Sequence, residues 1–382
     1  MSDLIVKLTD VCDFQGGSQP PKEGWITKPE DGYIRMLQIR DFTQNRASQE
    51  EYVKITNSTK TCKSDDILIA RYGASLGKIV TGLAGAYNVA LMKTIPDENL
   101  LTKRYLYYFL LSEHFQNKIL SLGSRAAQAG FNKAELDDIY IYLPDNVLQF
   151  KITSILDKAK ELIDKRKEQI EACDELIKGL FYHKFGDIES NDRAWDMKPF
   201  GYFSKIDTKM TKDFSRFADL FHIGIDNIEK ETGRLVNLKK VKESGLTSGK
   251  YIFNSNHIIY SKIRPNLNKV ALPNFDGLCS ADAYPLLVDT THTNREFFGY
   301  ILRSTAFLNY ILRLSSRTNI PKVNKDQLQG FCTIAPPFDL QNRFAEQVKK
   351  IEQQKQLLQQ SLTELENNFN ALMQRAFKGE LL

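Results

Sequence analysis

A repeat with a period of 191 or 192 residues organises almost the whole chain of 382 residues. Residues 67–79 align without a gap onto residues 258–270, and FQNKILSLGSR (115–125) matches FLNYILRLSSR (307–317). The correspondence continues along the chain to Phe185 and Phe377, over about 120 positions. Because chance would not keep one offset over such a length, we predict a tandem duplication of one structural unit.

Each repeat begins with a part of mixed character. Residues 1–145 and 191–337 combine short β-rich runs with turns of Gly, Asn and Pro and a few apolar helical stretches. Short apolar runs bounded by turn residues are typical of buried strands. The predicted buried strands lie at 67–70 and 258–261, and the predicted apolar helices lie at 101–122 and 294–314.

Each repeat ends in a stretch that predicts one long helix. Residues 146–184 and 338–378 have almost no Gly or Pro and are rich in Lys, Glu, Gln and Leu. Apolar residues recur at alternating spacings of four and three over about four heptads, which predicts a coiled coil. One basic residue interrupts each stripe, Arg166 in the first and Lys355 in the second. The predicted seam includes Ile152, Leu156, Ile163, Ile170, Ile177, Phe344, Ile351, Leu358, Leu365 and Leu372.

Two seams of equal length are most simply explained if they pair with each other. The alternative is that each helix packs flat on its own mixed part. A helix of about 39 residues is roughly 58 Å long, which would span one to two turns of duplex DNA. We therefore predict an α+β fold in which two similar mixed α/β domains are separated and joined by an antiparallel coiled coil with pseudo-twofold symmetry. The predicted domains are residues 1–145, 146–190, 191–337 and 338–382.

The positive charge of the chain is concentrated in its second mixed part. The formal net charge is +5, but residues 1–145 hold 17 basic and 18 acidic residues, whereas residues 191–337 hold 21 and 14. A basic surface favours a nucleic-acid partner.

Basic and amide residues follow the predicted buried strand in both repeats and recur in the second matched loop. Arg and Lys bind phosphates or guanine edges, and Asn and Gln bind adenine edges. The alternative for each single residue is an internal salt bridge. The predicted DNA-binding residues are Arg71, Tyr72, Ser75, Lys78, Arg125, Gln128, Lys262, Arg264, Asn266, Lys269, Arg317 and Asn319.

Motifs for catalysis, metal binding and membrane insertion are missing from the sequence. The run GASLGK at 73–78 is one residue short of a phosphate-binding loop, and Ile79 stands where Ser or Thr would bind Mg²⁺. The five cysteines and five histidines are scattered without CxxC, HxH or HExxH patterns. No apolar run approaches the roughly 18 residues of a membrane helix. We expect a soluble, cytoplasmic, non-catalytic protein that binds no cofactor or metal itself.

Taken together, these residues resemble the specificity subunit of Type I restriction–modification systems over essentially the full chain. The resemblance rests on DDILIARYGASLGK, on its second copy NHIIYSKIRPNLNK, and on the junctions IYIYLPDNVLQFKITSIL and CTIAPPFDLQNRFAEQV with their Pro-x-x-x-x-Gln spacing. It implies two target recognition domains that each read half of an asymmetric, interrupted sequence in double-stranded DNA, and long helices that set the spacer.

The same resemblance implies the partners and where the chemistry resides. Two modification subunits would bring S-adenosylmethionine and adenine N6 methylation, and restriction subunits would cleave DNA with ATP and Mg²⁺. Two other functions stay open at this point. One is the recognition subunit of a Type II-like system whose partner fuses nuclease and methyltransferase, and the other is a coiled-coil scaffold that binds protein and not DNA.

Overall fold

The computed structural model describes residues 5–43, 49–123, 130–315 and 321–382. The chain forms two compact units: unit 1 contains Met1–Glu168 and Gln359–Leu382, and unit 2 contains Gln169–Leu358. Each long helix therefore contributes one half to each unit. The boundary between the two units lies within both long helices. The division into four domains, which was made from the sequence, stays a prediction.

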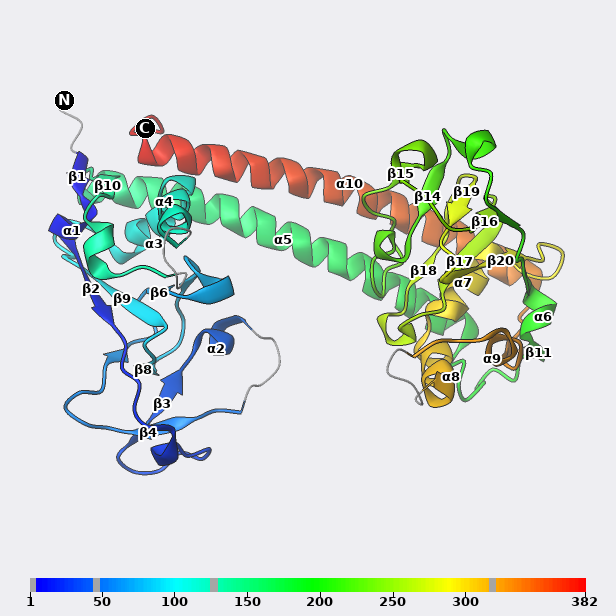
Figure 1. Cartoon of the computed structure of the whole chain (residues 1–382), viewed down its shortest axis with the longest axis horizontal. Coiled ribbons are helices and arrows are strands. Elements are labelled where there is room, and N and C mark those ends of the chain that lie inside the picture. The colour runs from blue at the N-terminus through cyan, green and yellow to red at the C-terminus, as the bar shows by residue number, and fades with distance from the viewer. Residues whose placement is uncertain (1–4, 44–48, 124–129, 316–320) are drawn as a thin grey trace. The chain divides into compact units, whose positions relative to one another are not determined.

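Unit 1 is built on three small sheets among its described residues (Figure 1), with strand orders β1-β10, β2-β9-β6-β7 and β4-β3-β8-β5. Its strands are β1 (Ile5–Lys7), β2 (Cys12–Gly16), β3 (Tyr33–Leu37), β4 (Tyr52–Lys54), β5 (Thr61–Cys62), β6 (Leu68–Ala70), β7 (Ile79–Val80), β8 (Gly85–Tyr87), β9 (Leu91–Pro96) and β10 (Tyr140–Tyr142). Its helical elements are α1 (Leu8–Val11), η1 (Lys22–Gly24), α2 (Ile39–Thr43), η2 (Gly73–Ser75), α3 (Lys103–Leu111), α4 (Glu113–Gly123), η3 (Lys133–Leu136) and the first part of α5 (Asn146–Phe185).

Unit 2 repeats this plan, with strand orders β11-β21, β12-β20-β17-β18 and β13-β16-β19-β14-β15. Its strands are β11 (Met197–Pro199), β12 (Ser204–Ile206), β13 (Met210–Thr211), β14 (Phe221–Ile223), β15 (Lys239–Lys240), β16 (Lys250–Phe253), β17 (His257–Ser261), β18 (Val270–Ala271), β19 (Gly277–Cys279), β20 (Ala283–Val288) and β21 (Cys332–Ile334). Its helical elements are α6 (Phe200–Phe203), η4 (Ser215–Phe217), η5 (Ile225–Asn227), η6 (Val241–Glu243), η7 (Pro265–Leu267), α7 (Arg295–Arg303), α8 (Thr305–Ser315), α9 (Lys325–Gln329) and the first part of α10 (Phe338–Phe377).

The strand registers confirm the duplication. Cys12 pairs with Pro96 at the end of the first four-stranded sheet, and Ser204 pairs with Val288 at the equal position of unit 2, with both partners displaced by 192 residues. The two predicted buried strands are also confirmed, because all residues of β6 and β17 are buried.

Each predicted apolar helix is in fact two helices, so that prediction was wrong. Ser112 separates α3 from α4, and Ser304 separates α7 from α8, both with extended backbone at ψ 151° and 154°. Each serine hydroxyl lies within hydrogen-bond distance of the amide three residues later, at Phe115 and Phe307. The hydroxyl of such a serine competes with the hydrogen bonds of the helix, so it ends one helix and caps the next. Apolar periodicity does not reveal this break.

Each hydrophobic core includes residues of the helix that belongs to the other repeat. In unit 1, Met373 and Ala376 of α10 are buried in one cluster with residues of α3, α4 and α5. In unit 2, Phe181 and Phe185 of α5 are buried with Phe297 of α7 and with residues of α10. The two repeats therefore depend on each other for complete cores.

The long helices pair antiparallel, as predicted. In unit 1, Lys167 of α5 forms an ion pair of 3.1 Å with Glu366 of α10. In unit 2, the Lys355 side chain forms an ion pair with Asp174 of α5, so the partner numbers fall as the helix numbers rise. Each of the ten predicted seam residues is buried or half-buried. No helix within the described ranges is long and apolar enough to cross a membrane.

A buried glutamine joins the mixed part of each repeat to its long helix. Gln149, which is fully buried, accepts hydrogen bonds from the amide (2.9 Å) and hydroxyl (3.0 Å) of Thr102 through its Oε1. Its Nε2 donates to the carbonyls of Leu100 (2.6 Å) and Pro144 (2.9 Å). Thr102 is the N-cap of α3, so one amide group fixes the beginnings of α3 and α5 against each other. This contact explains the Pro-x-x-x-x-Gln spacing of the junction.

The second junction repeats the arrangement. The Oε1 of Gln341 accepts from the Thr293 hydroxyl (2.8 Å) and the Asn294 amide (3.0 Å), and its Nε2 donates to the carbonyl of Pro336 (2.8 Å). Asn294 is the N-cap of α7, the counterpart of α3.

Candidate nucleic-acid interface

Unit 1 brings together two loop segments that are distant in sequence. Tyr72, in the turn after β6, forms an isolated β-bridge with Gly130. The Nε of Arg71 donates to the carbonyl of Phe131 over 3.1 Å. The two matched loops of the first repeat thus meet at one place. We call residues 71–78 together with 130–133 the first corner.

Unit 2 joins the corresponding segments in the same way. Ile263 forms an isolated bridge with Lys322. The amide of Arg264 donates to the carbonyl of Pro321 over 2.9 Å, and the amide of Val323 donates to the carbonyl of Lys262 over 2.7 Å. We call residues 262–269 together with 321–325 the second corner.

The backbone of the first corner favours glycine at several positions. Gly73 and Gly77 have φ values of 67° and 79°, in the left-handed region that favours glycine. The Nε2 of Gln116 on α4 donates to the Gly77 carbonyl over 2.9 Å and holds the turn. A Cβ at Gly130 would overlap the ring of Tyr72. Tyr72 is itself 43% exposed, so this close packing presents an aromatic ring at the surface.

The second corner has the same backbone without the glycines. Arg264 and Asn268 occupy the positions of Gly73 and Gly77, with φ values of 49° and 46°. The Asn268 side chain is buried and donates to the carbonyl of Arg303 over 2.8 Å. An Asn tolerates the left-handed region, whereas an Arg rarely adopts it.

Several cations gather at the second corner. Lys262 lies 5.2 Å from the ring centroid of Tyr284. Burial lowers the pKa of Lys262, Asp282 opposes this effect, and repulsion from Lys322 and Lys325 adds to it. Lys322, Lys325 and Arg264 are exposed. The corner therefore presents a positive surface suited to phosphate groups.

The predicted DNA-binding residues have different environments. Arg71 and Lys269 are tied to the fold, since Arg71 donates to Phe131 and the Lys269 Nζ donates to the carbonyl of Ile225 over 2.8 Å. Tyr72, Lys78, Arg264 and Asn266 are exposed, and Ser75 and Lys262 are half-buried. Arg125, Gln128, Arg317 and Asn319 lie outside the described residues.

Sequence reasoning missed Lys322 and Lys325 as members of this surface. They lie near Lys262 and Arg264 because the isolated β-bridge between Ile263 and Lys322 brings the two segments together. The repeat offered a partial signal, because Asn324-Lys325 matches Asn132-Lys133. In unit 1, however, Lys133 forms an ion pair with Asp13, so the equal position is neutralised.

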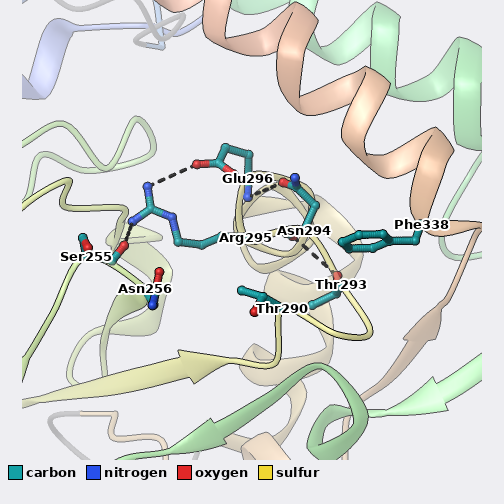
Figure 2. Close-up of a pocket in the computed structure, with 8 residues that line it drawn as sticks. All are labelled: Ser255, Asn256, Thr290, Thr293, Asn294, Arg295, Glu296 and Phe338. Atoms are coloured by element: carbon teal, nitrogen blue, oxygen red, sulfur yellow. Dashed lines mark hydrogen bonds and ion pairs between the residues drawn. The ribbon is translucent and has the colours of Figure 1, made fainter.

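A cavity with a volume of about 320 Å³ lies in unit 2 (Figure 2). Arg295 of α7 lines it and is already occupied, because its guanidinium donates to the carbonyls of Ser255 and Pro273 and pairs with Glu296. These contacts tie α7 to two turns of the sheets. The side chains around the cavity offer no nucleophile next to a base, and the described residues contain no His, Cys, Asp or Glu cluster suited to a metal ion.

Comparisons with known proteins agree with this architecture. The model of the family described as Type I restriction modification DNA specificity domain matches residues 4–172 and again residues 193–367. The chain is 26% identical over 356 residues to the Type I restriction enzyme EcoDI specificity subunit of Escherichia coli, covering 82% of this chain and 78% of that protein.

Two solved structures share the fold. One is a chain from a study of complex assembly and conformational transition in the type I R-M system, with a TM-score of 0.58, 16% identity and coverage of 99% and 98% of the two chains. The other is the S subunit of a Type I restriction–modification system from M. genitalium, with a TM-score of 0.56, 13% identity and coverage of 98% and 96%. Because the family model matches twice and covers most of the chain, the protein belongs to the Type I restriction modification DNA specificity family and is a non-catalytic DNA sequence-recognition subunit.

Proposed function

We propose that the chain directs a Type I restriction–modification complex to a bipartite DNA site, with one half-site read by each unit. The observation that carries this proposal is the duplicated corner, in which the same two loop segments meet in both units and leave polar and cationic side chains exposed. The residues proposed to contact DNA are Tyr72, Ser75, Lys78, Lys262, Arg264 and Asn266, together with Arg125, Gln128, Arg317 and Asn319. Arg71 and Lys269 are proposed to support the loops that carry them.

The adenine methylome of the source cell, with and without the gene, tests this function. We expect deletion to remove one motif of N6-methyladenine composed of two half-sites and a fixed spacer. Reintroduction of the gene should restore the same motif. An unchanged methylome, from a chain that does not co-purify with a methyltransferase, would contradict the proposal and favour the protein-binding scaffold. A partner that fuses nuclease and methyltransferase would indicate the Type II-like system.

The spacer between the half-sites is proposed to depend on the two long helices, each of 40 residues. Four residues inserted within 160–172 of α5 should change the number of unspecified base pairs and leave both half-site sequences intact. Four residues inserted at 187–191, after the end of α5, serve as the control and should keep the spacer. A changed half-site together with the old spacer would contradict this assignment.

Partner subunits are proposed to pack on apolar side chains at the beginning of α5. Val147 and Phe150 are 66% and 71% exposed, although large apolar side chains are usually buried. The proposed partners are two modification subunits and the restriction subunits, which would hold S-adenosylmethionine, ATP and Mg²⁺. Phe150→Asn, which copies Asn342 of the second repeat, should reduce co-purification of the modification subunit. Leu120→Asn, at an exposed position of α4, should not.

A further inference from the structure

Arg264 has a backbone conformation that its sequence position disfavours. Its φ and ψ are 49° and 60°, a region that non-glycine residues rarely adopt. The next residue is Pro265, and a residue before proline is pushed towards extended conformations. Strain of this kind persists only where the surrounding structure enforces it, and it often marks a functional position.

The surrounding structure does enforce this conformation. The Arg264 amide donates to the carbonyl of Pro321 over 2.9 Å, and its carbonyl accepts from the amide of Leu267 over 3.0 Å. Pro265 and Asn268 are buried beneath the turn. The turn is therefore held in place whether or not the residue at 264 has a side chain.

The first repeat shows that glycine is sufficient at this position. Gly73 has the equal place in the first corner, with φ 67°. An arginine at 264 therefore costs free energy that a glycine would not, and its benefit must come from its side chain. The Arg264 side chain is exposed, and it forms no hydrogen bond or ion pair with another side chain in the part of the chain that the structure describes.

The cations near Arg264 determine what this side chain would bind. Lys262, Lys322 and Lys325 share the second corner with Arg264. Asp282 acts on Lys262, Asp326 follows Lys325 in the sequence, and the amide of Glu231 donates to the Leu267 carbonyl in the turn. At the first corner, Gly73 stands in place of Arg264 and Gly130 in place of Lys322, and Lys133 is paired with Asp13. Repelling cations at an exposed loop favour a ligand with several negative charges, such as the sugar–phosphate backbone.

We propose that the second corner is a preformed clamp for the phosphate backbone of DNA, with Arg264 at its tip, and that it supplies more of the salt-dependent binding than the first corner does. This inference rests on the proposed function, and it adds a division of work between the two units. Phosphate contacts position a protein on the duplex without reading its sequence. The clamp therefore adds affinity for any sequence and leaves the target motif unchanged.

The test measures binding of the complex with its methyltransferase subunits to a duplex that contains the methylated motif, at increasing KCl concentration. Loss of one phosphate contact lowers the slope of log K against log salt by about one. Arg264→Gly should show this loss, keep the methylation motif, and be at least as stable as the wild type because glycine relieves the strain. Arg264→Lys should keep the slope. Lys78→Ala, at the exposed lysine of the first corner, should change the slope less.

Each other outcome has a distinct meaning. An unchanged slope and affinity for Arg264→Gly would overturn the clamp, and so would an equal loss from Lys78→Ala. An altered methylation motif would assign Arg264 to base reading, which overturns the clamp while the proposed function stands. A wild-type complex that binds the motif duplex no more tightly than a scrambled duplex would refute the proposed function itself.

Discussion

Replacement of Gln149 by Met should weaken unit 1 more than its small change in volume suggests. Methionine has a similar length and no branch, so the cavity is filled, but it neither donates nor accepts the four hydrogen bonds of this buried amide. The carbonyls of Leu100 and Pro144 and the amide of Thr102 would lose a partner at a part-buried junction. The lost free energy would therefore weaken the junction between the beginnings of α3 and α5.

The magnitude follows from the number of bonds. Each net hydrogen bond contributes about 0.5–1.5 kcal/mol, and each buried group left unsatisfied costs about 1–3 kcal/mol. Four bonds therefore give roughly 3–4 kcal/mol for Gln149→Met, a large share of the 5–15 kcal/mol of a typical domain. Gln341→Met removes three bonds, so its effect on unit 2 should be about three quarters as large.

The two tryptophans allow the units to be followed separately in urea. Trp25 lies in unit 1 and Trp195 in unit 2, where its Nε1 donates to the carbonyl of Phe185 over 2.8 Å. In a Trp195→Phe background, Gln149→Met should lower the midpoint of the Trp25 transition by about 1–2 M urea. Gln360→Met, at an exposed position of α10 within unit 1, is the matched control and should leave it unchanged. A loss below about 1 kcal/mol for Gln149→Met would refute the reasoning.

Three further predictions concern the cores and the seam. Burial, and to a lesser extent repulsion from Lys250, lowers the pKa of His222 to about 4. The imidazole is therefore protonated in the unfolded chain at a higher pH than in the folded chain. Stability should fall as the pH drops from 6.5 towards 4, by roughly 2 kcal/mol at pH 5. Thermal unfolding of His222→Met at pH 7 and pH 5 should lack this contribution. Phe377→Ala should destabilise unit 1 by about 2 kcal/mol and leave the Trp signal of unit 2 unchanged. Lys355→Ile should change stability by less than about 1 kcal/mol, whereas Asp174→Leu should cost about 3 kcal/mol in denaturant titrations, because it strands a buried ammonium.

The last of these comparisons rests on unequal burial within the ion pair. Lys355 is 8% exposed, whereas the side chain of Asp174 is 41% exposed. Water therefore hydrates the carboxylate when the lysine is removed, but it does not reach the ammonium when the carboxylate is removed. Ile163 stands at the equal seam position of the other repeat and is buried, so an isoleucine fits such a site.

The sequence alone predicted the features that follow from periodicity. A nearly constant offset of 191 or 192 residues between matched segments predicted the duplication, and the heptad stripes predicted the antiparallel helices. The same periodicity missed the breaks at Ser112 and Ser304, because a serine within an apolar stretch leaves the stripe intact while its hydroxyl ends the helix. The junction glutamines were visible as a spacing, but their hydrogen bonds to the N-cap of another helix are tertiary contacts.

The candidate site was predicted only in part, for a related reason. The strand-following cations were predicted because each follows a buried strand in the sequence, whereas Lys322 and Lys325 join Lys262 and Arg264 through a bridge between distant segments. The environment of a cation also depends on its partner. Arg71 and Lys269 were predicted to reach DNA but donate to main-chain carbonyls, which no feature of the sequence distinguishes from an exposed position.

The offset between the repeats varies along the chain, and its variation separates the framework that the two units share from the second sheet of each unit. It is 192 residues at the first strand pair, at the helices α3 and α7, and at the long helices. Met36 and His222 occupy equal places, since they pair with Ala86 and Leu278, yet they lie only 186 residues apart. Elements that must complete a shared core or a junction tolerate no change of length, because a shifted residue would lose its buried partners. Insertions and deletions have therefore accumulated in the second sheet and its loops, where the two units differ in strand number, and where a change alters what is presented to a ligand without disturbing the helices.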